Sequence, residues 1–260
     1  LTPRSGYRQL SERLNRFTQG APPTELLYRI LAMLFSSEEA ELVARLPIRP
    51  FTASQAAKRW QVAEAQAERL LENLADRALL VDIAANGRVE YVLPPPMAGF
   101  FEFALMRVRD DIDQKLLSEL YEQYITVEED FIKDLFLTGT TQLGRVFVQE
   151  EALAGAHALH VLDYEKASEV IQTASDIGVG LCYCRHKRQH QGLACAAEMD
   201  ICMTFNTVAS SLIRHEYVRR IDKVECLELL HKAREQNLVQ FGENVQQGVN
   251  FICNCCSCCC

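Results

Sequence analysis

The chain ends in the run Phe251-Ile252-Cys253-Asn254-Cys255-Cys256-Ser257-Cys258-Cys259-Cys260, which places six thiols in its last eight positions. Consecutive Cα atoms lie about 3.8 Å apart, closer than the roughly 4.4–6.8 Å that disulfide-bonded residues prefer. Neighbouring cysteines therefore do not readily bond to each other, and free thiols this dense would be easily oxidised. Coordination to metal ions or iron–sulfur clusters resolves the problem, because it deprotonates the thiols and offsets their charge. We interpret the tail as a metal–thiolate segment.

A second set of cysteines lies upstream of the tail. None of the eleven cysteines precedes position 182, and four fall within 21 residues: Cys182, Cys184, Cys195 and Cys202. Four thiolates match the ligand count of one [4Fe–4S] or [2Fe–2S] cluster, and they equally fit a closed zinc site. With the tail, ten candidate iron ligands are available for one or two [4Fe–4S] clusters: Cys182, Cys184, Cys195, Cys202, Cys253, Cys255, Cys256, Cys258, Cys259 and Cys260. Cys226, within an expected helix, is left out as a small apolar filler.

The local sequence indicates how the upstream ligands are delivered. The apolar stretch Ile177–Leu181 predicts a strand that leads directly into Cys182 and Cys184. Side chains alternate between the faces of a strand, so both thiols reach one cluster only if the strand bends or ends there. We expect Cys195 to approach from a loop and Cys202 from a following helix.

The segments on either side of these ligands are also readable. His160–Leu162 is expected to form a short strand, and Tyr164–Ser175 a helix. Phe251-Ile252 predicts a buried strand that carries Cys253 inwards. The spacings Cys253-x-x-Cys256 and Cys255-x-x-Cys258 are typical of ligands around a cluster corner.

A basic run, Arg185-His186-Lys187-Arg188-x-His190, follows the first two cysteines. One interpretation is a solvated loop. The other is a set of cations that raise the potential of a cluster by stabilising its reduced, more negative form. In that case Arg185, Lys187 and Arg188 can also dock an acidic electron partner. His186 and His190 are alternative ligands, although four cysteines already suffice.

The first half of the chain is expected to be mainly helical. Ser5–Phe17 predicts an amphipathic helix within residues 1–22, closed by Gly20 and the prolines that follow. Leucines and other apolar residues at helical spacing between Leu26 and Phe35 predict a buried helix. Thr52-Ala-Ser-Gln55 fits a capping box that opens a further helix.

A winged helix-turn-helix is predicted for residues 23–96. A tight turn around Gln61 leads to another helix, and Asn86-Gly87 between two β-prone runs is a strong hairpin signal. The presumptive recognition helix is acidic, and acidic residues oppose contact with phosphates. Its charges are Glu64, Glu68, Glu72 and Asp76 against Arg69 and Arg77. We therefore favour docking of a protein over DNA binding.

Residues 97–150 are expected to connect this module to a cysteine-rich iron–sulfur domain at 151–260. Two helices are predicted, Ala98–Arg107 and a long one from Asp111 to Leu137 with a continuous apolar face. Such a stripe is usually core or a dimer seam, so a homodimer stays open. The fold class is mainly α (α+β), with a helical spine and a small α/β domain.

Composition narrows the compartment and the partners. The chain shows no signal peptide and no apolar run of the ~18–20 residues that a membrane span needs. Disulfide scaffolds belong mainly to small secreted domains, so a reducing cytoplasm is expected. A net charge of −8 argues against a general nucleic-acid binder. A first residue Leu1 and a last residue Cys260 do not look like natural termini, so we expect part of a longer polypeptide.

The cysteine pattern resembles a known family. His160-Val-Leu-Asp-Tyr164, Cys182-Tyr-Cys184-Arg185, Cys195, Cys202 and the tail from Phe251 to Cys259 are similar to ferredoxin-type 4Fe–4S proteins of anaerobes. In those proteins a winged-helix half precedes the cysteine half, and a two-cluster ferredoxin module often follows. The resemblance implies iron–sulfur binding and electron transfer. The ferredoxin module is missing here, so the exit route for electrons is open.

The leading hypothesis is an iron–sulfur electron-transfer protein or redox-complex subunit, with a ferredoxin or flavoprotein as partner. No motif specifies a substrate pocket, so an electron-transfer component is favoured over a self-contained enzyme. The alternative is a redox-sensing winged-helix transcription regulator, whose DNA binding would change with the state of the cluster. A third hypothesis replaces iron with zinc in an interaction protein without a redox role.

Overall fold

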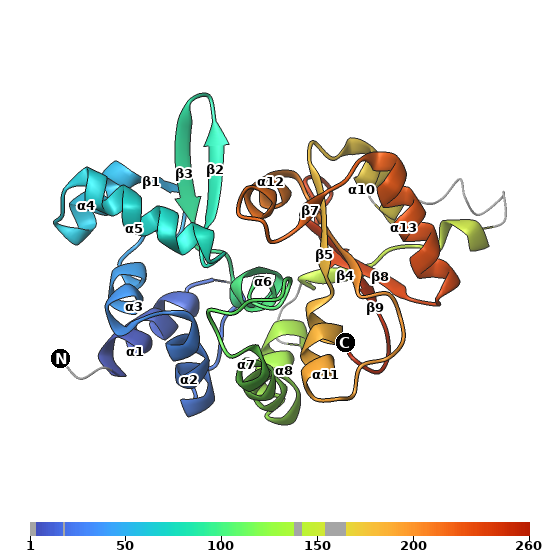
Figure 1. The fold of residues 1–260 in the computed structure, drawn as a ribbon, viewed down its shortest axis with the longest axis horizontal. Helices are drawn as coiled ribbons and strands as arrows, with labels where there is room; N and C mark the ends of the chain where they lie inside the picture. The colour runs from blue at the N-terminus through green and yellow to red at the C-terminus, as the bar shows by residue number, and fades with distance from the viewer. Residues whose placement is uncertain (1–3, 18, 138–141, 154–164) are drawn as a thin grey trace. The chain divides into compact units, whose positions relative to one another are not determined.

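The computed structural model describes residues 4–17, 19–137, 142–153 and 165–260. The chain divides into two compact units, Leu1–Thr140 and Thr141–Cys260 (Figure 1). Helices and small sheets occur in both units, so the predicted α+β class is confirmed. The second unit begins before the expected residue 151, because strand β4 (Gly144–Val146) pairs with a strand near the carboxyl end. The expected strand His160–Leu162 lies outside the described residues.

The first unit opens with three helices, and capping side chains fix the starts of the second and the third. They are α1 (Arg4–Leu14), α2 (Glu25–Leu34) and α3 (Ser37–Ala44). Thr24 accepts a hydrogen bond from the Leu27 amide at the start of α2. Ser36 and Glu39 form a reciprocal capping box at α3. Both motifs satisfy amide groups that have no partner inside the helix.

The predicted helix pair and hairpin follow. A short strand β1 (Phe51–Thr52) leads into α4 (Ala53–Trp60), and α5 (Glu64–Asp76) follows a left-handed Gln61 with φ 59°. Strands β2 (Val81–Ala85) and β3 (Arg88–Val92) are joined by Asn86 and Gly87, both at positive φ, as a two-residue hairpin turn requires. The sheet order is β1-β3-β2. The order of elements is confirmed, and the winged-helix class stays a prediction.

The capping box at α4 gives a test of stability in the first unit. Thr52 Oγ1 accepts from the Gln55 amide at 3.3 Å, and the Gln55 side chain accepts from the Thr52 amide at 3.0 Å. We expect Thr52→Ala to lower the free energy of unfolding by about 1 kcal/mol, because the Gln55 amide loses its partner. Thr52→Ser keeps the hydroxyl and should lose less than half as much. Urea unfolding measures both, and equal stabilities for the two variants would contradict the role of the cap.

The connector differs from the two helices that the sequence predicted. In place of Ala98–Arg107 there is a turn η1 (Pro96–Phe100) and a short α6 (Phe101–Phe103). The helix does not continue, and the Gln114 side-chain amide donates hydrogen bonds to the carbonyls of Ala104 and Arg107, at 3.0 and 2.8 Å.

The predicted long helix Asp111–Leu137 is also wrong. It divides into α7 (Gln114–Tyr121), a π-helical turn η2 (Glu122–Val127) and α8 (Asp130–Leu137). Glu129, at φ 58°, lies in the left-handed region and ends the helical path before α8. Aromatic rings pack the pieces together: Phe101 stacks on Tyr121 with centroids 5.0 Å apart.

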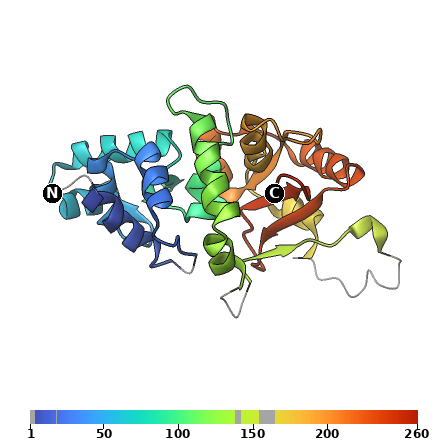
Figure 2. The same cartoon turned by 90° about the horizontal axis from the view of Figure 1, so that it is seen from below.

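The second unit is built on a six-stranded antiparallel sheet with strand order β4-β8-β9-β6-β5-β7 (Figures 1 and 2). The strands are β5 (Ile177–Leu181), β6 (Asp200–Phe205), β7 (Arg219–Arg220), β8 (Val239–Glu243) and β9 (Phe251–Cys255). The helices are α10 (Ala167–Thr173), α11 (Tyr183–His190), α12 (Asn206–Arg214) and α13 (Lys223–Glu235), with a 3₁₀ turn η3 (Glu150–Ala152).

The two faces of this sheet have different roles. Ile201, Met203 and Ile252 belong to a buried apolar cluster that also contains Ile171 of α10 and Leu230 of α13. Because successive side chains on a strand point to opposite faces, Cys202, Cys253 and Cys255 lie on the other face. The fold therefore separates a hydrophobic core from a face that carries thiols.

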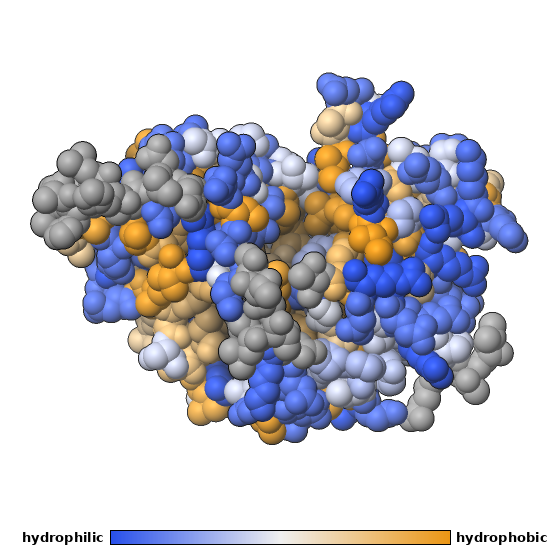
Figure 3. All heavy atoms as spheres, turned by 180° about the vertical axis from the view of Figure 1, so that it is seen from behind, coloured by the Kyte–Doolittle hydropathy of each residue, from blue (hydrophilic) through white to orange (hydrophobic). Residues whose placement is uncertain are grey.

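The surface is mixed in polarity. Hydrophilic side chains cover much of the face in Figure 3, and apolar ones lie between them in separate stretches. Among the residues that the structure describes, five large apolar side chains are more than half exposed: Val108, Val127, Val146, Leu193 and Val224. Among the described helices, none is both long enough and apolar enough to cross a membrane.

Candidate metal centre

The end of β5 delivers the first two cysteines. The strand stops at Leu181, Cys182 is the N-cap residue of α11, and Cys184 lies in the first turn of that helix. The Cys182 amide donates to the Met199 carbonyl at 2.7 Å, and its carbonyl accepts from the His186 amide at 2.9 Å. The two thiols thus do not diverge as on a strand, and the Cys184 thiol donates a hydrogen bond to Cys182. The expectation that the strand ends here is confirmed.

Cys195 and Cys202 lie on different kinds of element. Cys195 is in the loop between α11 and β6, as expected, and it accepts a hydrogen bond from the Ala197 amide. Cys202 is not on a helix: it lies within β6, opposite Gly180 of β5. The reason is that β6 pairs with β5 on one side and β9 on the other, which holds this segment extended.

The tail begins as the predicted buried strand. Ile252 is fully buried, and β9 lies between β8 and β6. The strand ends at Cys255 and the chain then turns, so that Cys260 returns to within 3.2 Å of Cys255, sulfur to sulfur. That distance is far longer than a disulfide bond of about 2.05 Å.

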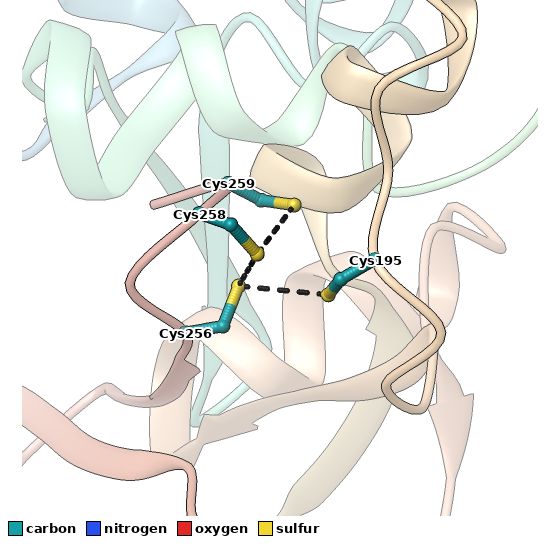
Figure 4. Close-up of side chains that lie close together, drawn as sticks. All are labelled: Cys195, Cys256, Cys258 and Cys259. Carbon is teal, nitrogen blue, oxygen red and sulfur yellow. Dashed lines mark hydrogen bonds between the residues drawn. The ribbon is translucent and has the colours of Figure 1, made fainter.

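Four thiols converge after this turn. Cys195, Cys256, Cys258 and Cys259 have all four sulfurs within 4.8 Å of one another (Figure 4). The sulfurs of Cys195 and Cys256 are 3.8 Å apart, those of Cys256 and Cys258 3.6 Å, and those of Cys258 and Cys259 3.5 Å. Three ligands come from the tail and one from the facing loop. We call these residues the Cys195 group, and the group can hold a metal ion.

A second set of four thiols lies beside α11. The Cys184 sulfur is 4.0 Å from that of Cys260, which is 3.2 Å from that of Cys255, and Cys182 bonds to Cys184. All four residues line one cavity, together with Cys202, Cys253 and Cys256. The cavity has a volume of about 20 Å³. We call Cys182, Cys184, Cys255 and Cys260 the Cys184 group.

The structure thus sorts the predicted ligands differently from the sequence. The four upstream cysteines do not form one site, since Cys195 joins three tail cysteines and Cys182 and Cys184 join two others. Of the expected pairs, Cys255 and Cys258 belong to different groups, whereas Cys253 and Cys256 line one cavity together. Among the described residues, the Cys195 group contains no histidine, so His186 and His190 are outside it.

The basic run is a helix, not the solvated loop of one interpretation. Arg185, His186 and Lys187 of α11 are at most 5% exposed. The Arg185 guanidinium donates to the Glu198 carbonyl at 2.9 Å and to the Asn254 carbonyl at 2.7 Å. It also bonds to the Cys195 thiol. Arg185 therefore points inwards, where its charge acts on the thiols and not on a docking partner.

Hydrogen bonds between the thiols push their pKa values apart. The bond from Cys184, aided by the charge of Arg185, lowers the pKa of Cys182 to about 7 against the cost of burial. Hydrogen bonds with Cys184 and Cys255 lower the pKa of Cys260 to about 3, and Cys184, as a donor, has its pKa raised. For Cys195, burial is outweighed by bonds from the Ala197 amide and neighbouring thiols, which lower its pKa to about 6. Burial raises the pKa of Cys259 to about 12, so both groups combine thiols of lowered and of raised pKa. A bound metal would shift them towards the thiolate, the form that binds metals.

Cys226 gives a prediction that tests whether its thiol binds metal or only packs in the core. It is fully buried in the apolar cluster under α13, and burial raises the pKa of its thiol to about 12. We expect Cys226→Ala to leave the metal content unchanged and to lower the free energy of unfolding by about 1 kcal/mol, the cost of a small cavity. Metal analysis and urea unfolding measure the two effects. A fall in metal content at unchanged stability would place Cys226 among the ligands.

The donor set defines the class of ion. Every donor is a cysteine sulfur, which selects soft or borderline ions such as zinc, copper(I) and iron in sulfur clusters over magnesium or calcium. Comparisons with protein-family models, with curated proteins and with solved structures find no match to this chain. The chain therefore carries a cysteine cluster that can bind a metal, and its assignment rests on the site itself.

Proposed function

We propose that this chain is an iron–sulfur electron-transfer protein or a redox-complex subunit, with its clusters in the second unit. The observation that carries the proposal is the convergence of the Cys195 group, whose four sulfurs lie within 4.8 Å of one another. Thiolates are the usual ligands of iron–sulfur clusters. A bound cluster would supply one-electron chemistry, and the residues of this unit would hold it and offset its charge.

The position of the thiols supports transfer of electrons to a partner. Cys258 and Cys260 are exposed, while Cys202 and Cys259 are buried. A metal group held between them would have one edge near solvent, which a redox protein can approach. The buried Arg185 supplies a fixed positive charge beside the thiols. A cation in this place stabilises the reduced form of a cluster, because that form carries the additional negative charge.

The first unit supports docking of a protein more than of DNA. The acidic residues of α5, Glu64, Glu68, Glu72 and Asp76, are all exposed. Arg77, one of the two basic residues near them, is held by Glu39 at 2.6 Å. Phosphate groups would meet a negative surface on this helix. A redox protein with a basic face, such as a ferredoxin or flavoprotein partner, fits it better.

The sulfur spacing favours a second candidate, a zinc site. Four sulfurs about 2.3 Å from one tetrahedral ion lie about 3.8 Å from one another. Three of the six pairs within the Cys195 group, at 3.5 to 3.8 Å, are close to this value, and all six lie within 4.8 Å. Ligands of a four-iron cluster bind four different metal atoms, so their sulfurs stand farther apart. A zinc-structured interaction protein is therefore the competing function.

Anaerobic purification of the full chain separates the two functions. We expect a brown protein with about four or eight irons per chain and a matching amount of acid-labile sulfide. Reduction should produce an electron paramagnetic resonance signal. A colourless protein that contains zinc and gives no signal would refute electron transfer and support the second candidate. Cys226→Ala is purified in parallel as a control, because it removes one thiol that lies outside both cysteine groups.

A further inference from the structure

We propose that Cys182, Cys184, Cys255 and Cys260 form a second metal site, separate from the Cys195 group. The proposal deepens the proposed function, on which it rests, by dividing the thiols of the second unit between two sites. It assigns Cys255 and Cys260 of the tail to one site, and Cys256, Cys258 and Cys259 to the other. The class of ligand is a thiophilic ion, either alone or as the corner of a cluster.

The first support is the contact between the thiols of the Cys184 group. Cys184 lies 4.0 Å from Cys260, and Cys260 lies 3.2 Å from Cys255. Cys182, the N-cap residue of α11, lines the same cavity as the other three. The two sulfur distances are close to the edge of about 3.8 Å expected around one tetrahedral ion, although among the described residues only the Cys195 group has all of its sulfurs within 4.8 Å of one another. Four thiols from two distant segments have no need to meet in this way unless something holds them together.

The second support is the cavity that these residues surround. About 20 Å³ of it admits the centre of a water-sized sphere, more than the roughly 10–15 Å³ that a single water needs. Its lining combines all members of the Cys184 group with Cys202 and Cys253 of the adjacent strands β6 and β9, and with Cys256 of the Cys195 group. A cavity walled mainly by thiols suits a soft ion better than it suits water.

The third support is the division of the tail by its own turn. β9 ends at Cys255, and the turn that follows returns Cys260 to Cys255 while Cys256 meets Cys195. The two groups share no thiol. Each takes at least one ligand from the tail and at least one from the segment between β5 and β6, so one ion at either site would clasp the tail to the body of the unit.

The fourth support is the placement of positive charge. Two tetrathiolate sites side by side would repel, since each carries a net negative charge after binding a divalent ion. Arg185 bonds to Cys195 of one group and acts on the charge of Cys182 in the other. Lys187, two residues after Arg185 on α11, acts through its charge on the Cys260 thiol. Cations thus lie where both sites need them.

Cobalt titration of the full chain tests the division. The protein is stripped of metal under a phosphine reductant and titrated with Co²⁺, while the thiolate-to-cobalt charge-transfer band is recorded. Four thiolates per tetrahedral ion predict about two equivalents for the native chain. The double variant C184S/C255S should bind about one, and so should C195S/C259S. The matched control Cys226→Ala should bind two.

A chemical footprint tests the same point without any variant. In the native chain saturated with Co²⁺, we expect eight cysteines to resist alkylation by a maleimide, among them Cys184 and Cys255, as read by mass spectrometry of peptides. Free alkylation of Cys184 and Cys255 in the loaded chain would overturn the second site. Binding of two equivalents by C184S/C255S would do the same.

Failure of the second site and failure of the proposed function give different results. Zinc in place of iron in the purified protein would refute electron transfer, yet a cobalt stoichiometry of about two would still establish the second site. Conversely, full iron and sulfide content in C184S/C255S would refute the second site and leave the electron-transfer proposal standing. The two proposals therefore fail on different measurements.

Discussion

Arg185→Gln is expected to lower the free energy of unfolding of the second unit by about 3 kcal/mol and to weaken metal binding. The native guanidinium is fully buried and donates to the carbonyls of Glu198 and Asn254 at 2.9 and 2.7 Å. Its pKa is raised despite burial, because the Cys182 and Cys195 thiols favour its charged form. Removing one partner from a buried charged network costs roughly 3–5 kcal/mol.

The redox potential supplies a readout that a purely structural role would not move. A unit charge several ångströms from a cluster, at an effective permittivity of about 20, contributes roughly 2 kcal/mol, or ~100 mV for one electron. We expect Arg185→Gln to lower the midpoint potential by tens of millivolts, measured by a dye-mediated titration. Arg185→Lys keeps the charge but not the paired donors, so it should lose stability while it retains most of the potential.

Arg188→Gln provides the matched control on the same helix. Arg188 is only partly buried and donates to the side chain of Gln191 at 3.1 Å, within its own helix end. We expect a change in unfolding free energy below about 0.5 kcal/mol and an unchanged midpoint potential. A potential that shifts equally in the Arg185 and Arg188 variants would show that Arg185 acts through net charge alone.

Features with a local signal were predictable from the sequence. The capping box at Thr52 and Gln55, the hairpin turn at Asn86-Gly87, and the strand that leads into Cys182 each depend on residues within a few positions of one another. The same holds for Cys226, which was expected to be an apolar filler as a lone cysteine within a helix and is buried in the core. Local chemistry sets these conformations, so no knowledge of the tertiary fold was needed.

The division of the thiols could not be predicted, because it depends on strand order. Spacing along the chain groups Cys182, Cys184, Cys195 and Cys202 together. The sheet instead places β9 between β8 and β6, so the tail emerges beside the loop of Cys195 and the start of α11. Cys202 was assigned to a helix for the same reason: nothing near it in sequence reveals that β6 has a neighbour on each side.

Arg185 shows how a charge run can be misread. Consecutive basic residues usually lie in solvent, and composition alone favours that interpretation. The carbonyls that receive the guanidinium come from residues 13 and 69 positions away, Glu198 and Asn254. A buried arginine becomes recognisable only when the distant acceptors and the thiols around it are known. The place of Arg185 directly after the Cys182-x-Cys184 pair was the one available signal.

Removal of metal is expected to destabilise the second unit and leave the first unchanged. The five residues after β9 have no further strand to join, and their sulfurs meet those of Cys195 and Cys184. An ion that binds only the folded state adds about 4 kcal/mol when its free concentration is 1,000 times its Kd. Chelation abolishes that term, so the unfolding of residues 141–260 should move to a much lower temperature.

The single tryptophan makes the two units separately observable. Trp60 belongs to the first unit, where it is 5% exposed and its indole N–H donates to the Leu42 carbonyl at 2.8 Å. We expect the thermal transition seen by tryptophan fluorescence to be the same before and after chelation. The transition of the second unit, which is detected by far-ultraviolet circular dichroism but not by tryptophan fluorescence, should shift to lower temperature after chelation. A chain with Cys184, Cys195, Cys255 and Cys259 all changed to serine should show no response to the chelator. An equal shift of the Trp60 transition would contradict the assignment of the bound metal to the second unit alone.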